Sequence, residues 1–191
     1  MLPNNSVGQQ NLSRWIRGSS QQAEDAPDLP PIDHVSRRGT DFALANMADR
    51  FIAVTGGGGS DSTNAVSVRD VHRFDIQGNT WEKLPDLNIP RHAHSSTSVD
   101  GNLYVFCGLS VSEQGEDAIS TIEVLDDACS ALDLISMWRV ITLAPSVLAP
   151  RFYTAVAQVN DDQIAIIGGL GFDEAGDLGV MGDVVVFDAV A

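Results

Sequence analysis

The chain has 191 residues, 43% of them hydrophobic, and its 26 acidic and 11 basic residues give a net charge of −15. Such an acidic surface repels phosphate backbones and anionic headgroups, so we expect neither nucleic acid nor a membrane surface as a partner. No apolar run reaches transmembrane length, and the polar N-terminus lacks the apolar core of a signal peptide. The two cysteines, Cys107 and Cys129, lack metal-type spacing, which favours a reduced, cytoplasmic protein.

Residues 1–36 are rich in Ser, Gln, Pro and Asp, which is typical of a low-complexity segment. One apolar island, around Trp15, is similar to the later segments at Trp81 and Trp138. We therefore predict a stray strand at Trp15.

Beyond this segment, short runs of apolar residues alternate with glycine-rich turns, a pattern that predicts an all-β fold. Three times an apolar strand runs into glycine, as a Gly-Gly pair or as Cys107-Gly108, and a later strand ends in an aromatic residue or leucine followed by aspartate. The second glycine and the aspartate are 18, 18 and 19 residues apart (57 to 75, 108 to 126, 169 to 188). This spacing predicts an internal repeat.

The repeats divide the chain into units at 37–90, 91–150 and 151–191. In the middle unit we expect strand a at 92–99, strand b at 102–107 and strand c at 121–125, with Trp138 opening strand d. The turn at Asp100-Gly101 is suited to joining antiparallel neighbours. The third unit lacks a tryptophan strand, so we expect it to be without strand d.

The pattern resembles the kelch repeat of β-propellers. The motif positions are Gly56, Gly57, Phe74, Asp75, Trp81, Gly108, Asp126, Trp138, Gly168, Gly169, Phe187 and Asp188. The middle unit departs from the motif, with Cys107 for the first glycine and Leu125 for the aromatic residue. The resemblance implies four-stranded antiparallel blades, in which these residues build the scaffold.

Closed propellers typically have four to eight blades, and this chain supplies about three. Two explanations stay open at this point: the chain is part of a larger propeller, or two copies form a homodimer that completes a six-bladed ring.

The resemblance also implies a binding face, formed by the d–a and b–c loops, that takes a protein or peptide. Arginines that open strand a in such blades correspond here to Arg91 and Arg151, and less clearly to Arg38. Phe152 and Tyr153 are the aromatic anchors that we expect beside them. The alternative for the arginines is a structural role at the rim.

Two further features of this face are polar. His92 and His94 are further candidates for contact with the partner. They would share one face of a strand and form half of a zinc site, but the sequence shows no third ligand, so we expect no metal and no cofactor. The alternative is that they are ordinary polar residues of an inner strand. The b–c loops at 58–61, 113–117 and 173–177 consist mainly of acidic or small residues. They either attract a basic peptide or are simply solvated.

The sequence shows no nucleophile elbow, phosphate loop or paired catalytic carboxylates. The leading hypothesis is therefore a non-enzymatic interaction module. A kelch-type enzyme acting on a carbohydrate or another small polar ligand is the alternative, and a truncated propeller fragment without independent function is the second alternative.

Overall fold

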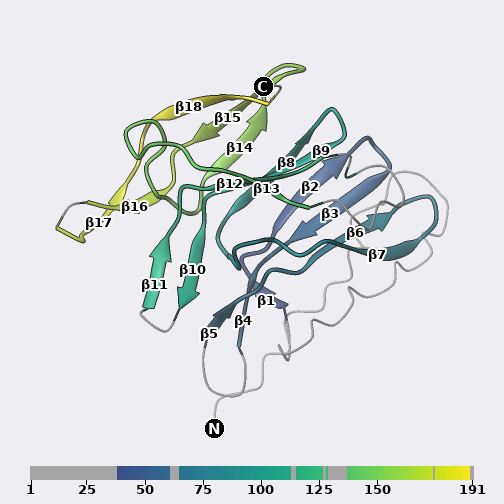
Figure 1. Cartoon of the computed structure of the whole chain (residues 1–191), viewed down its shortest axis with the longest axis horizontal. Coiled ribbons are helices and arrows are strands. Elements are labelled where there is room, and N and C mark those ends of the chain that lie inside the picture. Colours follow the sequence, from purple (N-terminus) through teal and green to yellow (C-terminus); the bar gives the residue numbers. More distant parts are fainter. Residues whose placement is uncertain are drawn as a thin grey trace, which may run out of the picture.

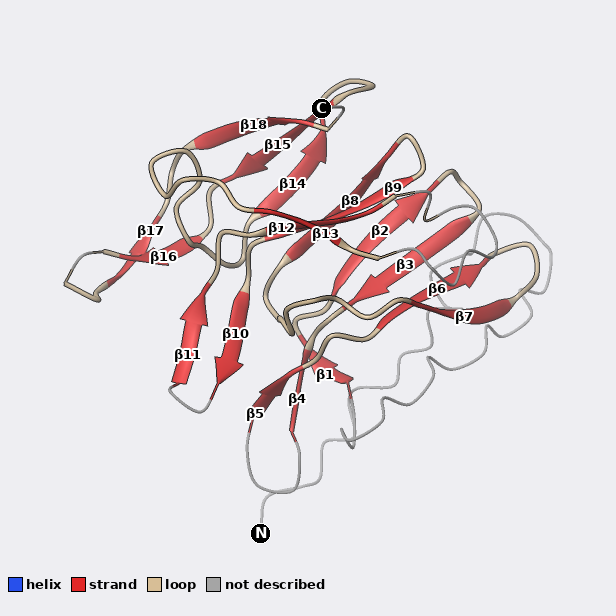
Figure 2. Ribbon diagram, in the orientation of Figure 1, coloured by secondary structure: helices blue, strands red, loops and turns tan. Residues whose placement is uncertain are grey.

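The computed structural model describes residues 38–60, 65–112, 115–126, 128, 137–173 and 175–189. Every regular element in these ranges is a β-strand, and the strands form six antiparallel sheets (Figure 2). The all-β prediction is therefore confirmed. The strand expected at Trp15 lies outside the described residues, as do most of the residues between Asp126 and Met137.

The three larger sheets are the blades. They lie side by side and do not close into a ring (Figure 1). Blade 1 contains β2 (Ala43–Met47), β3 (Phe51–Thr55), β6 (Val71–Asp75) and β7 (Thr80–Leu84). Blade 2 contains β8 (Ser95–Val99), β9 (Asn102–Phe106), β12 (Ile122–Leu125) and β13 (Arg139–Ile141). Blade 3 contains β14 (Ala155–Gln158), β15 (Gln163–Ile167) and β18 (Val184–Asp188).

The connections between the second and third strands of the blades are paired strands rather than open loops. The hairpins are β4 (Gly58–Ser60) with β5 (Ala65–Ser67), β10 (Leu109–Ser112) with β11 (Gly115–Ala118), and β16 (Leu170–Phe172) with β17 (Leu178–Val180). A short strand before blade 1, β1 (Arg38–Thr40), pairs with β4. All three hairpins extend from the same end of the blades, which we call the hairpin face (Figure 1).

The hydrophobic core lies between neighbouring blades. One cluster joins blades 1 and 2 and includes Met47, Phe51 and Trp138, whose indole Nε1 donates to the Pro85 carbonyl oxygen at 2.8 Å. A second cluster joins blades 2 and 3 and includes Phe106, with the ring of Phe187 set edge-on 5.9 Å away. Of the motif positions, Trp138 and Phe187 thus lie in the gaps between blades, whereas Phe74 and Trp81 pack on each other within blade 1, with ring centroids 5.1 Å apart.

Backbone hydrogen bonds repeat the same inter-blade contact twice on the hairpin face. The Ala93 amide donates to the Asp41 carbonyl oxygen at 2.8 Å, and the Tyr153 amide donates to the Ala93 carbonyl oxygen at 2.8 Å. Asp41, Ala93 and Tyr153 each lie two residues before the first strand of a blade, with φ values of 59°, 51° and 52°. A left-handed residue thus occupies the same place in every blade.

The glycine pair makes the second repeated contact. The Gly57 amide donates to the Arg91 carbonyl oxygen and the Gly108 amide to the Arg151 carbonyl oxygen, both at 2.8 Å. Gly108 has a φ of 106°, and a Cβ there would lie 2.7 Å from Cβ of His94, so only glycine fits. Cys107, just before it, adopts a φ of 60°, the conformation that Gly56 and Gly168 adopt in the other blades.

The aspartate of the motif organises a turn in blade 1. Oδ1 of Asp75 accepts the amides of Gln77 at 2.9 Å and Gly78 at 3.1 Å, and Arg50 Nη2 lies 2.7 Å from its Oδ2. Arg50 and the backbone amides therefore lower the pKa of Asp75 to about 2. The other two aspartates pair differently: Asp126 with Arg139, and Asp188 with the side-chain amide of Gln163.

Candidate partner-binding face

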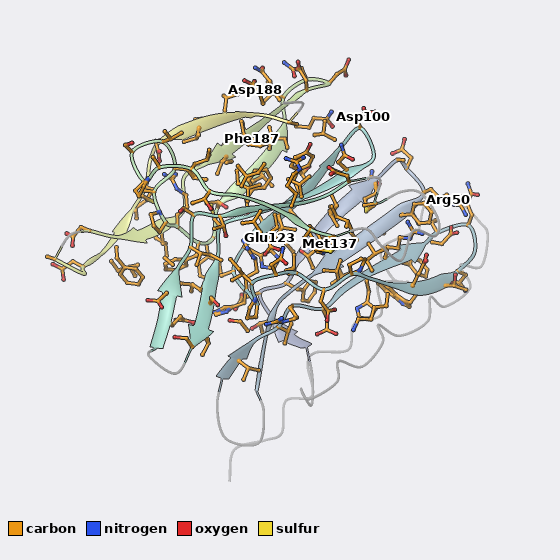
Figure 3. All side chains as sticks on the ribbon, viewed as in Figure 1. Arg50, Asp100, Glu123, Met137, Phe187 and Asp188 are labelled. Atoms are coloured by element: carbon orange, nitrogen blue, oxygen red, sulfur yellow. The ribbon has the colours of Figure 1, made fainter. Side chains whose placement is uncertain are left out.

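Arg91 lies under the hairpin face, and its side chain is fully buried. Its guanidinium donates to the carboxylate of Glu123 at 2.6 Å, to the Cys107 carbonyl oxygen at 2.8 Å and to Thr121. Figure 3 shows Glu123 in the interior of the molecule. Burial lowers the pKa of Arg91, and the charge of Glu123 opposes this shift.

Glu123 has a second function beside its ion pair. Its two carboxylate oxygens accept the amides of Asn88 at 2.7 Å and Ile89 at 3.1 Å. The pair therefore fastens the chain entering blade 2 to the third strand of that blade.

Arg151 occupies the corresponding place in blade 3, and its side chain is also buried. It donates to the carbonyl oxygens of Ala149 and Gly168 and to both carboxylate oxygens of Asp183, at 2.8 and 3.0 Å. Asp183 is 51% exposed, and the hydrogen bonds from Arg151 lower its pKa. In blade 1 the residue equivalent to Arg91 and Arg151 is Gly39 and not Arg38. Gly39 lies two residues before the left-handed Asp41, just as the two arginines precede Ala93 and Tyr153.

The prediction that Arg91 and Arg151 contact a partner is still a prediction, but their geometry favours the structural alternative. Each guanidinium is saturated by groups of the protein itself. A partner at the surface would find neither side chain exposed.

His92 and His94 do not share a strand face, because the strand begins only at Ser95 and Ala93 between them is left-handed. The expected alternation is wrong here for that reason. His94 is buried, and its Nε2 lies 2.8 Å from the hydroxyl of Thr55 in blade 1. In the part of the chain that the structure describes, no group of three or more His, Cys, Asp and Glu is arranged to hold a metal ion.

His92 instead joins two hairpins. The Val111 amide donates to the Ser67 hydroxyl at 3.0 Å, and this hydroxyl lies 2.9 Å from Nδ1 of His92. Nε2 of the same ring lies 3.0 Å from Oε1 of Glu116. In the neutral ring the Ser67 hydroxyl donates to Nδ1, so Nε2 carries the proton and donates to Glu116. This chain of hydrogen bonds connects β5 of blade 1 with β10 and β11 of blade 2.

The exposed part of the face is aromatic. Phe152 is buried, and its ring centroid lies 5.5 Å from that of Tyr153 and 5.9 Å from that of Phe172. Tyr153 is 56% exposed and Phe172 is 50% exposed. Of the two predicted anchors, Phe152 is therefore the support and Tyr153 is the accessible ring.

Two carboxylates act on Tyr153. Partial burial, the negative charge of Asp41 and that of Glu116 all raise the pKa of the phenol. The carboxylate of Asp41 also accepts the hydroxyl of Thr40 at 3.1 Å. The accessible ring thus lies in a negative field.

Two residues of this face, Asp41 and Phe172, were missed by the sequence reasoning. Asp41 could have been found by register, because it precedes its strand by two residues, as Ala93 and Tyr153 do. Phe172 carried no such signal, since its exposure depends on the pairing of β16 with β17.

The comparisons with known proteins point to the same repeat. The family model described as "Kelch motif" matches residues 57–88, which run from the glycine pair of blade 1 through its last two strands. An F-box/kelch-repeat protein of Arabidopsis thaliana is 35% identical over an alignment of 88 residues that covers 43% of this chain. The chain spans 25% of that relative's length.

The matched motif, the blades with their glycine pairs and the similar relative agree with one another. Among the described residues no helix is long and apolar enough to cross a membrane. Residues 57–88 thus match the kelch motif, and the chain is similar to a kelch-repeat protein over part of its length.

Proposed function

We propose that the chain is a non-enzymatic interaction module that binds a protein or peptide on its hairpin face, in the cytoplasm. The observation that carries this proposal is the pair of exposed rings, Tyr153 and Phe172, held against the buried Phe152. Rigid aromatic side chains on a preformed support are the residues that most often dominate binding energy at interfaces. The similarity to a kelch-repeat protein supports a role in protein interaction in general.

The double variant Tyr153→Ala and Phe172→Ala tests the proposal. We expect it to lose the partners that the wild-type chain recovers from a cell extract, while thermal unfolding confirms that it is folded. Ile76→Ala is the matched control, because Ile76 is an exposed apolar residue in the turn of blade 1. Recovery of the same partners by the double variant would contradict the proposal. Variants of Arg91 or Arg151 are unsuitable, since both side chains support the fold.

The alternative, an enzyme acting on a carbohydrate, predicts a different result. A sugar that binds only the folded chain raises its melting temperature. A thermal-shift screen with sugars and divalent metals should therefore give no stabilisation if the interaction module is correct.

A second part of the proposal concerns the outward face of blade 3, where apolar side chains are exposed on two strands: Ile167, Val184 and Val186. We propose that a further blade packs there. A second copy placed head to tail would supply it and give six blades, within the range of closed propellers. Light scattering should then give twice the mass of the chain, and a monomer at all concentrations would exclude a second copy as the source.

A further inference from the structure

We infer that the partner of the hairpin face is a basic peptide segment, with an arginine or lysine side chain over the ring of Tyr153 and an apolar side chain on Phe172. This inference rests on the proposed function and names the chemistry of its partner. It is argued from three features of the face: the supported rings, the carboxylates beside them and the placement of the cations.

The ring of Tyr153 offers an accessible aromatic surface next to negative charge. A cation over an aromatic face is attracted by the ring, and the attraction is greater where carboxylates lie beside it. Asp41 and Tyr153 belong to one row of inter-blade backbone bonds, because the Tyr153 amide donates to the Ala93 carbonyl oxygen and the Ala93 amide donates to that of Asp41. Glu116 of β11 contacts His92, the residue before Ala93. The two carboxylates near Tyr153 therefore come from two different blades. A guanidinium over the ring can therefore pair with either carboxylate.

The carboxylates are held in place by their own contacts. Asp41 accepts the Thr40 hydroxyl, and Glu116 lies 3.0 Å from Nε2 of His92. Glu116 is nevertheless half exposed, which leaves its outer oxygen accessible. An arginine that binds there would extend this existing pair rather than break it.

Phe172 gives the face its second anchor, at the end of the hairpin of blade 3. Asp173 follows it directly, and Oδ1 of Asp173 accepts the amides of Ala175 and Asp177 at 2.9 Å. A peptide whose apolar side chain lies on the ring of Phe172 would thus have the carboxylate of Asp173 nearby. This arrangement suits a peptide that alternates apolar and basic side chains.

The two arginines that precede blades 2 and 3 do not compete for these carboxylates. Arg91 and Arg151 are buried under the face and paired with Glu123 and Asp183. With the net charge of −15, this arrangement leaves the exposed surface around Tyr153 complementary to a basic partner.

The probe is a fluorescent peptide of alternating arginine and leucine, titrated with the full chain in a fluorescence anisotropy experiment. Matched peptides replace each arginine with glutamate, or each leucine with serine. We expect the arginine–leucine peptide to bind about tenfold more tightly than either of the others. Equal or tighter binding of the glutamate peptide would overturn the inference.

Because any acidic protein attracts basic peptides, the decisive variants must not change the charge. Tyr153→Ala is such a variant, and alanine is compatible with the position because Ala93 occupies the corresponding place in blade 2 with nearly the same φ. We expect this variant to bind the arginine–leucine peptide about tenfold more weakly. Unchanged binding would show attraction by net charge alone and would overturn the inference.

A second comparison removes one charge from either end of the blades. Asp41 and Asp100 are both aspartates with positive φ, 59° and 49°, so asparagine is tolerated at either. Asp41→Asn should weaken binding, whereas Asp100→Asn, in the turn at the opposite end (Figure 3), should not. Equal effects of the two variants would contradict the inference.

The proposed function and this inference can fail separately. If the basic peptide does not bind but cellular partners are still lost on Tyr153→Ala with Phe172→Ala, the hairpin face is the binding site and the partner chemistry is wrong. If partners and basic peptide are both unaffected by these variants, the face itself is wrong.

Discussion

The guanidinium of Arg91 lies 2.6 Å from the carboxylate of Glu123, and both side chains are completely withdrawn from solvent. In blade 3 the corresponding arginine pairs with Asp183, which is half exposed. The two pairs thus differ both in geometry, with one carboxylate oxygen bound by Arg91 and both bound by Arg151, and in their surroundings. Water solvates only the second pair well. Removing the carboxylate of Glu123 should therefore lower the stability of the fold more than removing that of Asp183.

Glu123→Gln leaves a buried guanidinium without its counter-charge. We expect the free energy of unfolding to fall by about 3–5 kcal/mol, as when one partner of a buried pair is removed. Asp183→Asn is the matched control, and it should cost about 1 kcal/mol or less because solvent screens the pair. Urea denaturation of both variants measures the difference, and equal losses would contradict the structural role of Arg91.

Gly108→Ala should be among the most destabilising single changes in the chain. The added Cβ would lie 2.7 Å from Cβ of His94, at a φ of 106° that alanine rarely adopts. Steric overlap and backbone strain together should cost about 3 kcal/mol or more.

Two other glycines separate these contributions. Gly115→Ala meets no neighbouring atom within 4 Å but keeps a positive φ of 131°, so it should cost about 1–2 kcal/mol from strain alone. Gly182→Ala has open space and no such φ, and should stay within about 0.5 kcal/mol of the wild type. Chemical denaturation should give this order, and a Gly108→Ala variant as stable as Gly182→Ala would contradict the close approach.

The turn around Asp75 should stabilise the fold in a pH-dependent way. Its pKa falls from 3.8 to about 2 on folding, so its contribution is fully present above about pH 4 and is lost as the pH falls through 2. The stability difference between the wild type and Asp75→Asn should therefore shrink as the pH falls from about 4 towards 2. Urea denaturation across this range tests it. A difference that does not change with pH would mean that the carboxylate charge is unimportant.

Cys107 should react slowly with thiol reagents while the chain is folded. It is buried, and burial raises the pKa of its thiol to about 11, so little thiolate exists at neutral pH. In a Cys129→Ser variant, which leaves Cys107 as the single cysteine of the chain, labelling by a chromogenic disulfide should be much faster in urea than in buffer. Equal rates would show that the core of blades 2 and 3 opens readily.

The repeat register, the strands and the inter-blade aromatic residues could be predicted from the sequence. Strand b of each unit is a continuous apolar run that ends at glycine, and the expected strand b of the middle unit, 102–107, differs from β9 by one residue. Burial accounts for this signal: β9 lies between two neighbouring blades and is buried along most of its length, whereas β15 leaves Ile167 exposed on the outward face of blade 3.

The candidate site was less predictable, because it depends on backbone conformations that single residues do not reveal. Ala93 has no special tendency towards a left-handed φ, yet its conformation separates His92 from His94. The burial of Arg91 depends on Glu123, 32 residues later in the chain, and no local pattern connects the two. The hairpins likewise arise from pairing across loops that look merely polar in the sequence.

The inter-blade bonds at Asp41, Ala93 and Tyr153 have a consequence for how this scaffold can change. Each bond uses only the amide and the carbonyl of the backbone, so the side chain at that position is not needed to hold neighbouring blades together. An acid, a methyl group and a phenol occupy the three equivalent places. Ala93 is buried against Leu109 and Phe152, whereas Tyr153 is exposed and can be exchanged with little loss of stability. The backbone bonds that join the blades are thus independent of the side chain that the surface presents at Tyr153.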